Sequence, residues 1–248
     1  MESMLAFDIE TYADWDALSP AVRDYLARRE RGRSVEDARS RAAGTVGLRP
    51  GLAGVIAVGL WGGEGDTARL FLDPSSPTGV HRAHDEQGEI VRCRSEAELL
   101  REFWDRVGAR VAQGSRLVSF NGRGFDGPIL MLRSAVLGLR PSVYLAGRRS
   151  LRPHCDLLDV LGFFGASRGT YGLDYWCHVF GVPSPKGELD GAGVAAAYER
   201  GEVETIGRYA LGDARATGEL FRRLEGTLLP LLEEAAGPAF PPVAEPGP

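Results

Sequence analysis

Two carboxylates placed two residues apart in an apolar segment are the first groups whose spacing suggests chemistry. Asp8 and Glu10 alternate with apolar residues in the segment Leu5–Thr11, and this pattern predicts a strand. Residues i and i+2 of a strand face the same side of a sheet. Neighbouring carboxylates repel each other and are costly to bury, and a bound divalent cation removes that cost. The alternative is a strand end whose acids face water.

A third carboxylate follows a glycine-rich turn. Asp126 comes after the stretch Asn121–Phe125 and directly before Gly127-Pro128, so we expect it at the N-cap of a helix. Gly122 and Gly124 let the backbone come close to a ligand. Alternatively, Asp126 only caps the helix and Asn121 is only a turn residue.

A tyrosine and a fourth carboxylate lie four residues apart in a segment with helical periodicity. Tyr209 and Asp213 therefore share one helix face. Ile206 and Ala210 place that face near the core. The alternative is a Tyr and an Asp on a helix surface.

The elements that must position these groups indicate an α/β domain with a mixed sheet. We expect strands at Leu5–Thr11, Val55–Trp61, Arg69–Leu72 and Arg116–Phe120. We expect helices after the capping box of Ser95 and Glu98, after Asp126, and at Asp156–Phe164, Tyr171–Phe180 and Val203–Leu232. Residues 15–42 are interpreted as helices or a charged insertion, 73–90 and 181–193 as loops, and 236–248 as a Pro-rich disordered tail.

The bulk composition suits one globular domain. The chain has 248 residues, of which 44% are hydrophobic and 25% charged. No apolar run is long enough to span a membrane, and the N-terminus does not resemble a signal peptide. Three cysteines without a C-x-x-C pair indicate unpaired thiols in a reducing cytoplasm. His81 and His84 lie in an expected loop without the further ligands that zinc requires.

The net charge is −5, which argues against wide nonspecific binding to a duplex. It does not argue against a metal-dependent nuclease, because two divalent cations would cancel the charge of four carboxylates.

Taken together, the three motifs resemble those of the DEDD superfamily of 3′–5′ exonucleases, in the subgroup whose third motif carries tyrosine. Two further stretches resemble stand-alone exonucleases similar to the proofreading domain of family-B DNA polymerases. They are Asp156–Leu161 (Asp-Leu-Leu-Asp-Val-Leu) and Lys186–Gly191 (Lys-Gly-Glu-Leu-Asp-Gly). The resemblance covers roughly residues 4–225, and the third motif departs from it only in Leu211-Gly212.

This resemblance implies an RNase H-like fold with a mixed central β-sheet flanked by helices. It implies one exonuclease domain at residues 1–235, with a charged insertion at about 28–48. The implied activity is two-metal hydrolysis from the 3′ end of single-stranded nucleic acid, with DNA favoured and with Mg²⁺ or Mn²⁺ as the metal.

The resemblance also implies the roles of individual residues. Asp8, Glu10, Asp126 and Asp213 would bind the metals, with Asp8 bridging them, and Tyr209 would orient the attacking water. The residues expected to contact the substrate are Thr11, Asn121, Gly124, Phe125 and Lys186.

Several alternatives stay open at this point. The same site would serve an exoribonuclease, and an inactive relative would only bind nucleic-acid ends or a partner protein. Lys186 either touches a phosphate or faces solvent. Arg148, Arg149 and Arg152 either follow a single-stranded backbone or form a solvated basic loop.

Overall fold

A mixed β-sheet forms the centre of the molecule. The computed structural model describes residues 2–30, 34–76, 79–147, 150–167, 169–185, 189, 191 and 193–236. Within these ranges seven strands form one sheet in the order β4-β5-β3-β2-β1-β6-β7. The strands are β1 Met4–Tyr12, β2 Gly54–Gly63, β3 Asp66–Leu72, β4 His81–Asp85, β5 Gly88–Cys93, β6 Arg116–Ser119 and β7 His154–Asp156. β1 lies inside the sheet, next to the middle strand β2, and it pairs antiparallel with β2 and parallel with β6.

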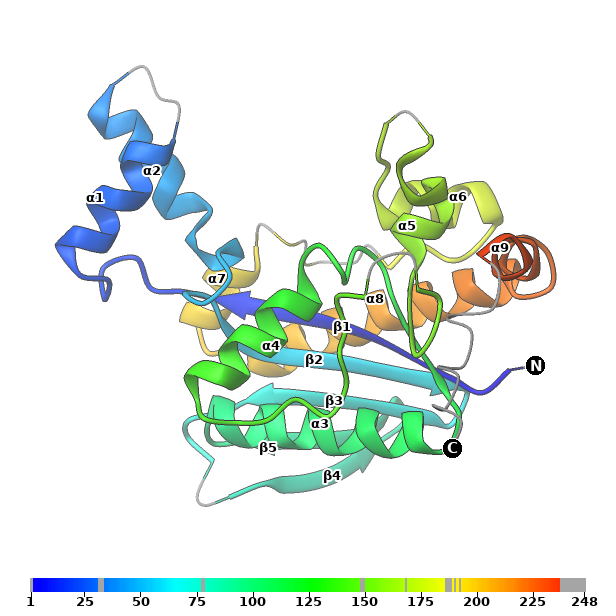
Figure 1. Cartoon of the computed structure of the whole chain (residues 1–248). Coiled ribbons are helices and arrows are strands. Elements are labelled where there is room, and N and C mark those ends of the chain that lie inside the picture. Colours follow the sequence, from blue (N-terminus) through cyan, green and yellow to red (C-terminus); the bar gives the residue numbers. More distant parts are fainter. Residues whose placement is uncertain are drawn as a thin grey trace, which may run out of the picture.

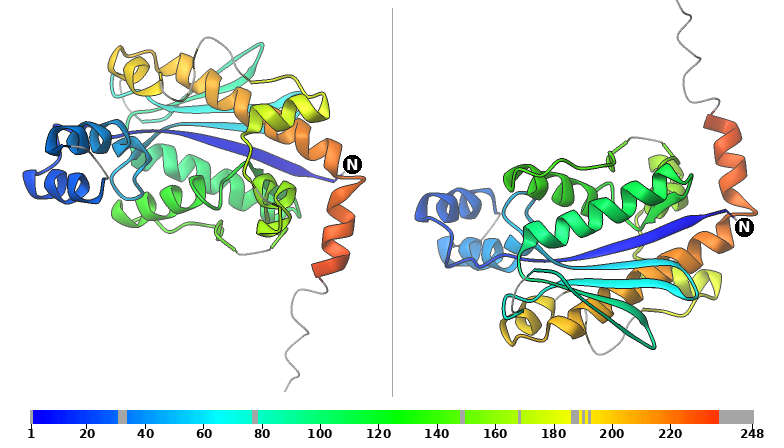
Figure 2. Two further views of the ribbon diagram at one scale, coloured as in Figure 1. Left: turned by 90° about the horizontal axis from the view of Figure 1, so that it is seen from above. Right: turned by 90° about the horizontal axis from the view of Figure 1, so that it is seen from below.

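Helices cover both faces of this sheet, as Figures 1 and 2 show. The α-helices are α1 Pro20–Arg29, α2 Val35–Gly44, α3 Glu96–Ala112, α4 Asp126–Val136, α5 Leu157–Leu161, α6 Leu173–Phe180, α7 Val194–Glu199, α8 Val203–Leu224 and α9 Leu228–Ala236, and the 3₁₀ helices are η1 Val46–Leu48 and η2 Phe163–Gly165. α3 and α4 lie on one face, and α8 lies on the other (Figure 2). The predicted α/β class with a mixed sheet is confirmed.

The alternation of side chains along β1 divides the core into two layers. Leu5, Phe7 and Ile9 pack with the apolar side chains of α3 and α4. Met4 and Ala6 point to the opposite face and pack with those of α8. The predicted capping box of α3 is present, because the Ser95 and Glu98 side chains bond each other's backbone N–H groups.

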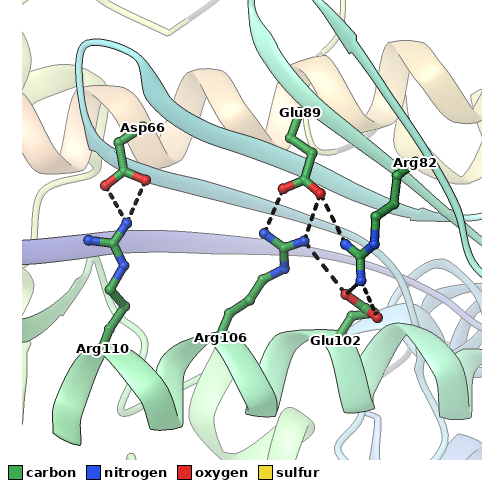
Figure 3. Close-up of polar contacts among 6 residues, drawn as sticks. All are labelled: Asp66, Arg82, Glu89, Glu102, Arg106 and Arg110. Atoms are coloured by element: carbon green, nitrogen blue, oxygen red, sulfur yellow. Dashed lines mark hydrogen bonds and ion pairs between the residues drawn. The ribbon is translucent and has the colours of Figure 1, made fainter. Parts of the chain in front are cut away.

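The prediction of a loop at residues 73–90 is wrong, because β4 and the start of β5 lie there. All five side chains of β4 are exposed at the edge of the sheet, so this strand lacks the apolar alternation that marks a strand in sequence. Ion pairs hold the hairpin to α3 (Figure 3). Glu89 of β5 binds Arg106 of α3 at 2.8 Å, and Arg82 of β4 binds Glu102 of α3 at 2.7 Å. Arg110 of α3 also pairs with Asp66 of β3.

The predicted long helix Val203–Leu232 is also wrong in part, because it is divided into α8 and α9. Pro230 lacks an N–H and its ring collides with the carbonyl four residues earlier, so a continuous helix is broken before it. In the first turn of α9 the same proline is tolerated. The short helices expected near residues 156–164 and 171–180 are present as α5 and α6.

A helical arm stands away from the sheet at one end of the molecule (Figure 1). It consists of α1, α2 and η1 and covers most of the expected charged insertion. Its own small core contains Leu26, Ala42 and Val46. α5 and α6 stand on the same side of the molecule, at the other end (Figure 1).

Cys93, Cys155 and Cys177 are unpaired and buried, and burial raises the pKa of the Cys155 thiol to about 12, which disfavours a nucleophilic role. Lys186 and residues 237–248 of the expected tail lie outside the described residues. Among the helices of the described part, none is both long enough and apolar enough to cross a membrane.

Candidate active site

The two carboxylates of the first strand lie on one face of the sheet. Asp8 and Glu10 continue the row of Met4 and Ala6, so both point to the side of β1 that α8 covers. The register of β1 with β2 shifts between Glu10 and Thr11, directly after the second acid. This bulge interrupts the β1–β2 ladder, and the pairing resumes at Thr11 and Tyr12.

Close packing of α8 on the sheet brings the fourth acid to this face. Gly59 of β2 lies opposite Asp8 in the register of the sheet. A Cβ atom at Gly59 would lie 2.2 Å from the carbonyl oxygen of Ala210, so only glycine allows α8 to pack this closely. Asp213 lies one helical turn further along α8. Asp8, Glu10 and Asp213 each have a carboxylate oxygen within 4.8 Å of the others.

Asp126 approaches from the loop between β6 and α4. β6 runs parallel to β1, so the loop that follows it lies at the same edge of the sheet as the end of β1. Asp126 is 3% exposed, and its carboxylate accepts a hydrogen bond from the backbone N–H of Ile9. The expected N-cap role is wrong, because α4 begins at Asp126 itself and Phe125 occupies the N-cap position.

The four carboxylates perturb one another's proton affinity. Burial, followed by the charges of Asp126, Glu10 and Asp213, raises the pKa of Asp8 well above its usual value. Burial and the charge of Asp213 do the same to Glu10. Burial raises the pKa of Asp126 to about 7 and that of Asp213 to about 6. A hydrogen bond from the Tyr209 side chain to Asp213 partly offsets this rise.

This donor set fits hard divalent cations. Carboxylate oxygens are the ligands that Mg²⁺ and Mn²⁺ prefer in proteins. The described residues that line the cavity around the acids include no Lys or Arg, so no side chain of that lining neutralises them. A buried group of like charges without a counter-charge is unfavourable, and bound dications would supply the counter-charge.

A cavity of about 730 Å³ gives access to the acids. All four carboxylates line it, and so do Thr11, Asn121 and Phe125 of the expected substrate residues. The Thr11 hydroxyl also donates to the carbonyl of Gly47 at 2.6 Å, which ties the helical arm to the end of β1. The opposite wall comes from α2, η1 and the start of α7.

The other expected substrate residues differ in their placement. Gly124 is not among the lining residues, but a Cβ there would lie 2.6 Å from the Asn121 side-chain oxygen, so it leaves room for that side chain. Lys186 is outside the described residues. Of the expected basic cluster, Arg148 and Arg149 are also outside them, and Arg152 pairs with Glu2 at 2.5 Å.

Asp156 and Arg123 hold the loop beside the acids through contacts that the sequence did not predict. Asp156 caps the helix that follows it, because its carboxylate accepts a hydrogen bond from the Leu158 N–H at 3.0 Å. The same carboxylate accepts from the backbone N–H groups of Asn121 and Arg123, both at 2.8 Å. The Arg123 guanidinium binds Asp159 at 2.6 Å. Asn121 is thereby fixed with a φ of 63°, a left-handed conformation that Asn tolerates.

The buried floor of this loop is polar. The Ser119 hydroxyl and the His154 Nε2 lie 2.7 Å apart, and His154 Nδ1 is 2.7 Å from the Leu145 carbonyl oxygen. Burial lowers the pKa of His154 to about 4, so the ring is neutral at physiological pH. A Cβ at Gly122 would lie 2.1 Å from the Ser119 hydroxyl oxygen, which explains this glycine. The only sequence signal for this network is the pair of glycines in the turn.

The fold and the acid cluster together define an RNase H-like α/β domain. Over 96% of its length the chain superposes on 27% of the family B DNA polymerase from the hyperthermophilic archaeon Pyrobaculum calidifontis, with a TM-score of 0.59 and 21% sequence identity. The chain thus spans about a quarter of the length of that polymerase. In all, 89 chains of solved structures match it.

The family follows from the sequence comparison. Residues 88–231, more than half of the chain, match the family described as predicted 3′–5′ exonucleases related to the exonuclease domain of PolB, and the chain belongs to this family. The matched segment contains Asp126, Tyr209 and Asp213, and the acids of β1 precede it. No curated protein matches the sequence.

Proposed function

We propose that this protein is a two-metal 3′–5′ exonuclease of the tyrosine-containing DEDD subgroup, acting on single-stranded nucleic acid and preferentially on DNA. The observation that carries the proposal is the convergence of Asp8, Glu10 and Asp213, with oxygens within 4.8 Å of one another, in a cavity that Asp126 also lines. The family to which the chain belongs supports the reaction and its polarity.

Asp8, Glu10, Asp126 and Asp213 hold the metals in this proposal. Two Mg²⁺ or Mn²⁺ ions, when bound, activate the attacking water and stabilise the leaving oxygen of the phosphodiester. By resemblance to the superfamily, Asp8 is the group that would bind both metals, and it lies close to Glu10 and Asp213 in the cluster. Glu10 and Asp213 would hold one metal, and Asp126 would hold the other.

Tyr209 orients the water in this scheme. Its side chain already hydrogen-bonds Asp213, so its hydroxyl lies beside a proposed metal ligand. A phenol has an ordinary pKa near 10, so it orients a water better than it deprotonates one. The terminal nucleotide occupies the cavity of about 730 Å³, next to Thr11, Asn121 and Phe125. These three residues are its proposed contacts, and Gly124 and Lys186 are proposed to contribute nearby.

Residues 1–235 act as one exonuclease domain, with the helical arm as a wall of the cavity. The three unpaired, buried cysteines favour a reducing compartment, and we place the protein in the cytoplasm.

The test compares Asp8→Asn and Asp213→Asn with a matched change outside the site. Asp105 is exposed on α3, which lies on the other face of the sheet, so Asp105→Asn is the control. Hydrolysis of a single-stranded DNA and of an RNA of the same sequence is followed with Mg²⁺, Mn²⁺ or EDTA.

We expect metal-dependent hydrolysis, faster on DNA, that falls more than about 100-fold in either site variant and is unchanged in the control. Full activity of a site variant would refute the metal assignment. Faster cleavage of RNA would make the protein an exoribonuclease. No cleavage of either polymer would favour a module that only binds nucleic acid.

A further inference from the structure

A pair of exposed tyrosines lies at the start of α6. Tyr171 and Tyr175 are 46% and 45% exposed, yet their rings stack on each other with centroids 4.3 Å apart and planes 20° apart. Trp176 meets both rings edge-on, at 89° and 81°. Trp176 in turn packs against the core together with Phe180. Trp176 therefore holds the two tyrosine rings in place against the core, while a large part of the ring surface faces solvent.

A second cavity extends from the acid cluster to Tyr171, one residue of this pair. It has a volume of about 350 Å³, and its lining includes Asp8 and Asp213 together with Asn121, Leu158 and Tyr171. The first cavity also contains Asp8, Asp213 and Asn121 in its lining. The acids thus lie between two spaces, one closed by the helical arm and the other bordered by Tyr171. Leu158 of α5 and Leu173 of α6 line this second cavity. Both helices lie away from α1 and α2 (Figure 1).

The charges of the residues that line the two cavities restrict how these cavities can bind a nucleic-acid strand. Neither cavity contains a Lys or an Arg among its described lining residues, and the net charge of the chain is −5. The described side chains of these walls therefore supply no positive charge for phosphates, the usual source of affinity for nucleic acids. Aromatic faces bind unpaired bases of any sequence by stacking and require no positive charge.

We propose that Tyr171 and Tyr175 form a stacking platform for the bases of a single strand on the 5′ side of the scissile phosphate. The inference rests on the proposed exonuclease function, in which the terminal nucleotide occupies the first cavity. The strand that remains must then leave through the second space, past Tyr171. Bases within a duplex already stack on their neighbours, so only unpaired bases can use this platform. Tyr171 and Tyr175 are thus specificity-determining residues that select single-stranded 3′ ends.

Binding can be measured without cleavage. In an Asp8→Asn background with Mg²⁺, we would determine the Kd of a fluorescent twelve-nucleotide oligo(dT) for Tyr171→Ala, Tyr175→Ala, Tyr171→Phe and Tyr171→Leu. Tyr144 is 68% exposed and is not part of either cavity lining, so Tyr144→Ala is the matched control. We expect both platform alanine variants and Tyr171→Leu to weaken binding about tenfold or more, and Tyr171→Phe and the control to bind as the parent does.

A strand with one abasic unit, directly before the 3′-terminal nucleotide, distinguishes stacking from a structural role. It should bind the parent more weakly, and Tyr171→Ala should weaken it no further, because the base that Tyr171 contacts is missing. Equal affinity of Tyr171→Ala and the parent for oligo(dT) would overturn the platform. So would a Tyr171→Ala effect that is equally large on the abasic strand.

Cleavage separates failure of the platform from failure of the acid site. A strand that is abasic everywhere except at its 3′ terminus should be cleaved equally by the wild type and by Tyr171→Ala, whereas KM for oligo(dT) should rise about tenfold in the variant. If the variant cleaves oligo(dT) with unchanged KM, the platform is refuted and the acid site stands. If the wild type cleaves neither strand but binding still depends on Tyr171, the exonuclease function is refuted and the stacking surface stands.

Discussion

At the residue scale, the central feature is a group of carboxylates that is unfavourable without a counter-charge. Each of them has a raised pKa, and burial is the first cause in every case. A raised carboxyl pKa means that the folded state binds protons more tightly than the unfolded chain. Metals and protons therefore compete for the same oxygens.

Because the pKa values of the four carboxyl groups are raised, the stability of the metal-free protein should fall as the pH rises. The pKa of Asp126 is about 7 in the folded protein against an ordinary value of 3.8. Asp126 destabilises the folded state once the pH exceeds its pKa in the unfolded chain. This destabilisation grows with pH until the pH passes its pKa in the folded protein. In EDTA we expect the melting temperature to fall between about pH 4 and about pH 7, and Mg²⁺ to restore it most at the upper end.

Asp126→Asn is the variant that isolates this effect. It removes one of the interacting charges, so the decrease of melting temperature with pH in EDTA should be shallower than in the wild type. An unchanged slope, together with no Mg²⁺ stabilisation at about pH 8, would contradict the account of the site.

Tyr209→Phe removes only the hydroxyl. If that group orients the water, kcat should fall about 100-fold while KM stays near the wild-type value. Mg²⁺ affinity, measured by calorimetry, should change little, because the four carboxylates remain. A variant with normal kcat would show that the hydrogen bond from Tyr209 to Asp213 serves only the packing of α8.

Sequence spacing was sufficient to place the acids of β1 on one face and to pair Tyr209 with Asp213 on one helix. It did not reveal the contacts of Asp156 with Asn121 and Arg123, because these join backbone N–H groups and a side chain more than 30 residues apart. Nothing in the local pattern of either segment specifies such a bond. Asp156 was recognisable only as a helix cap.

At the element scale, the approach of α8 to β2 decides whether Asp213 reaches the other acids. Gly59 makes that approach possible, because any side chain would collide with the Ala210 carbonyl. The helix carries matching glycines, since a Cβ at Gly218 would lie 2.1 Å from the Trp61 ring. These close contacts fix α8 along the sheet and so position Asp213 relative to Asp8.

Gly59→Ala should therefore damage both stability and activity. The added methyl group meets backbone that cannot move independently, so we expect a loss of about 3 kcal/mol in the free energy of unfolding, from chemical denaturation. Metal-dependent activity should fall as well, because α8 must shift. Gly44→Ala is the matched control: it has no atom within 4 Å of the added Cβ and should leave stability unchanged or slightly higher. Equal stability of the two variants would refute this role of Gly59.

The elements found from sequence were those with strong apolar periodicity, such as β2 and α3. Three strands were missed: β4 and β7, which lie at the two edges of the sheet, and β5, which lies between β4 and β3. β7 has only three residues. The exposed strand β4 pairs along its whole length with β5, and its Arg82 forms an ion pair with Glu102 of α3 (Figure 3). Because this ion-pair partner of β4 comes from a distant segment of the chain, the sequence of the strand itself does not predict it.

At the scale of the whole molecule, the acids lie between two cavities with walls of different character. The arm of α1, α2 and η1 closes one side, and α6 with its aromatic side chains borders the other. The arm precedes the segment that matches the family, which begins at residue 88. The sequence of this region indicates a charged insertion, but nothing in it indicates that η1 lines the cavity. The hydrogen bond from Thr11 to Gly47 joins segments 36 residues apart.

The absence of Lys and Arg from the described cavity walls predicts weak salt dependence. If the protein neutralises no more than about two phosphates of a single strand, Kd should rise less than about tenfold between about 50 and about 200 mM NaCl. Fluorescence titration of the Asp8→Asn variant with oligo(dT) would measure it. A thousandfold loss of affinity over this range would show that a basic surface elsewhere dominates binding.

The most direct test of the central claim is the polarity of cleavage. One single-stranded DNA is labelled at its 5′ end in one reaction and at its 3′ end in another, and both are incubated with wild-type protein and Mg²⁺. The account predicts that the 5′-labelled strand shortens one nucleotide at a time, while the 3′ label appears at once as a mononucleotide. Immediate release of the 5′ label, internal cuts or an intact strand would contradict it.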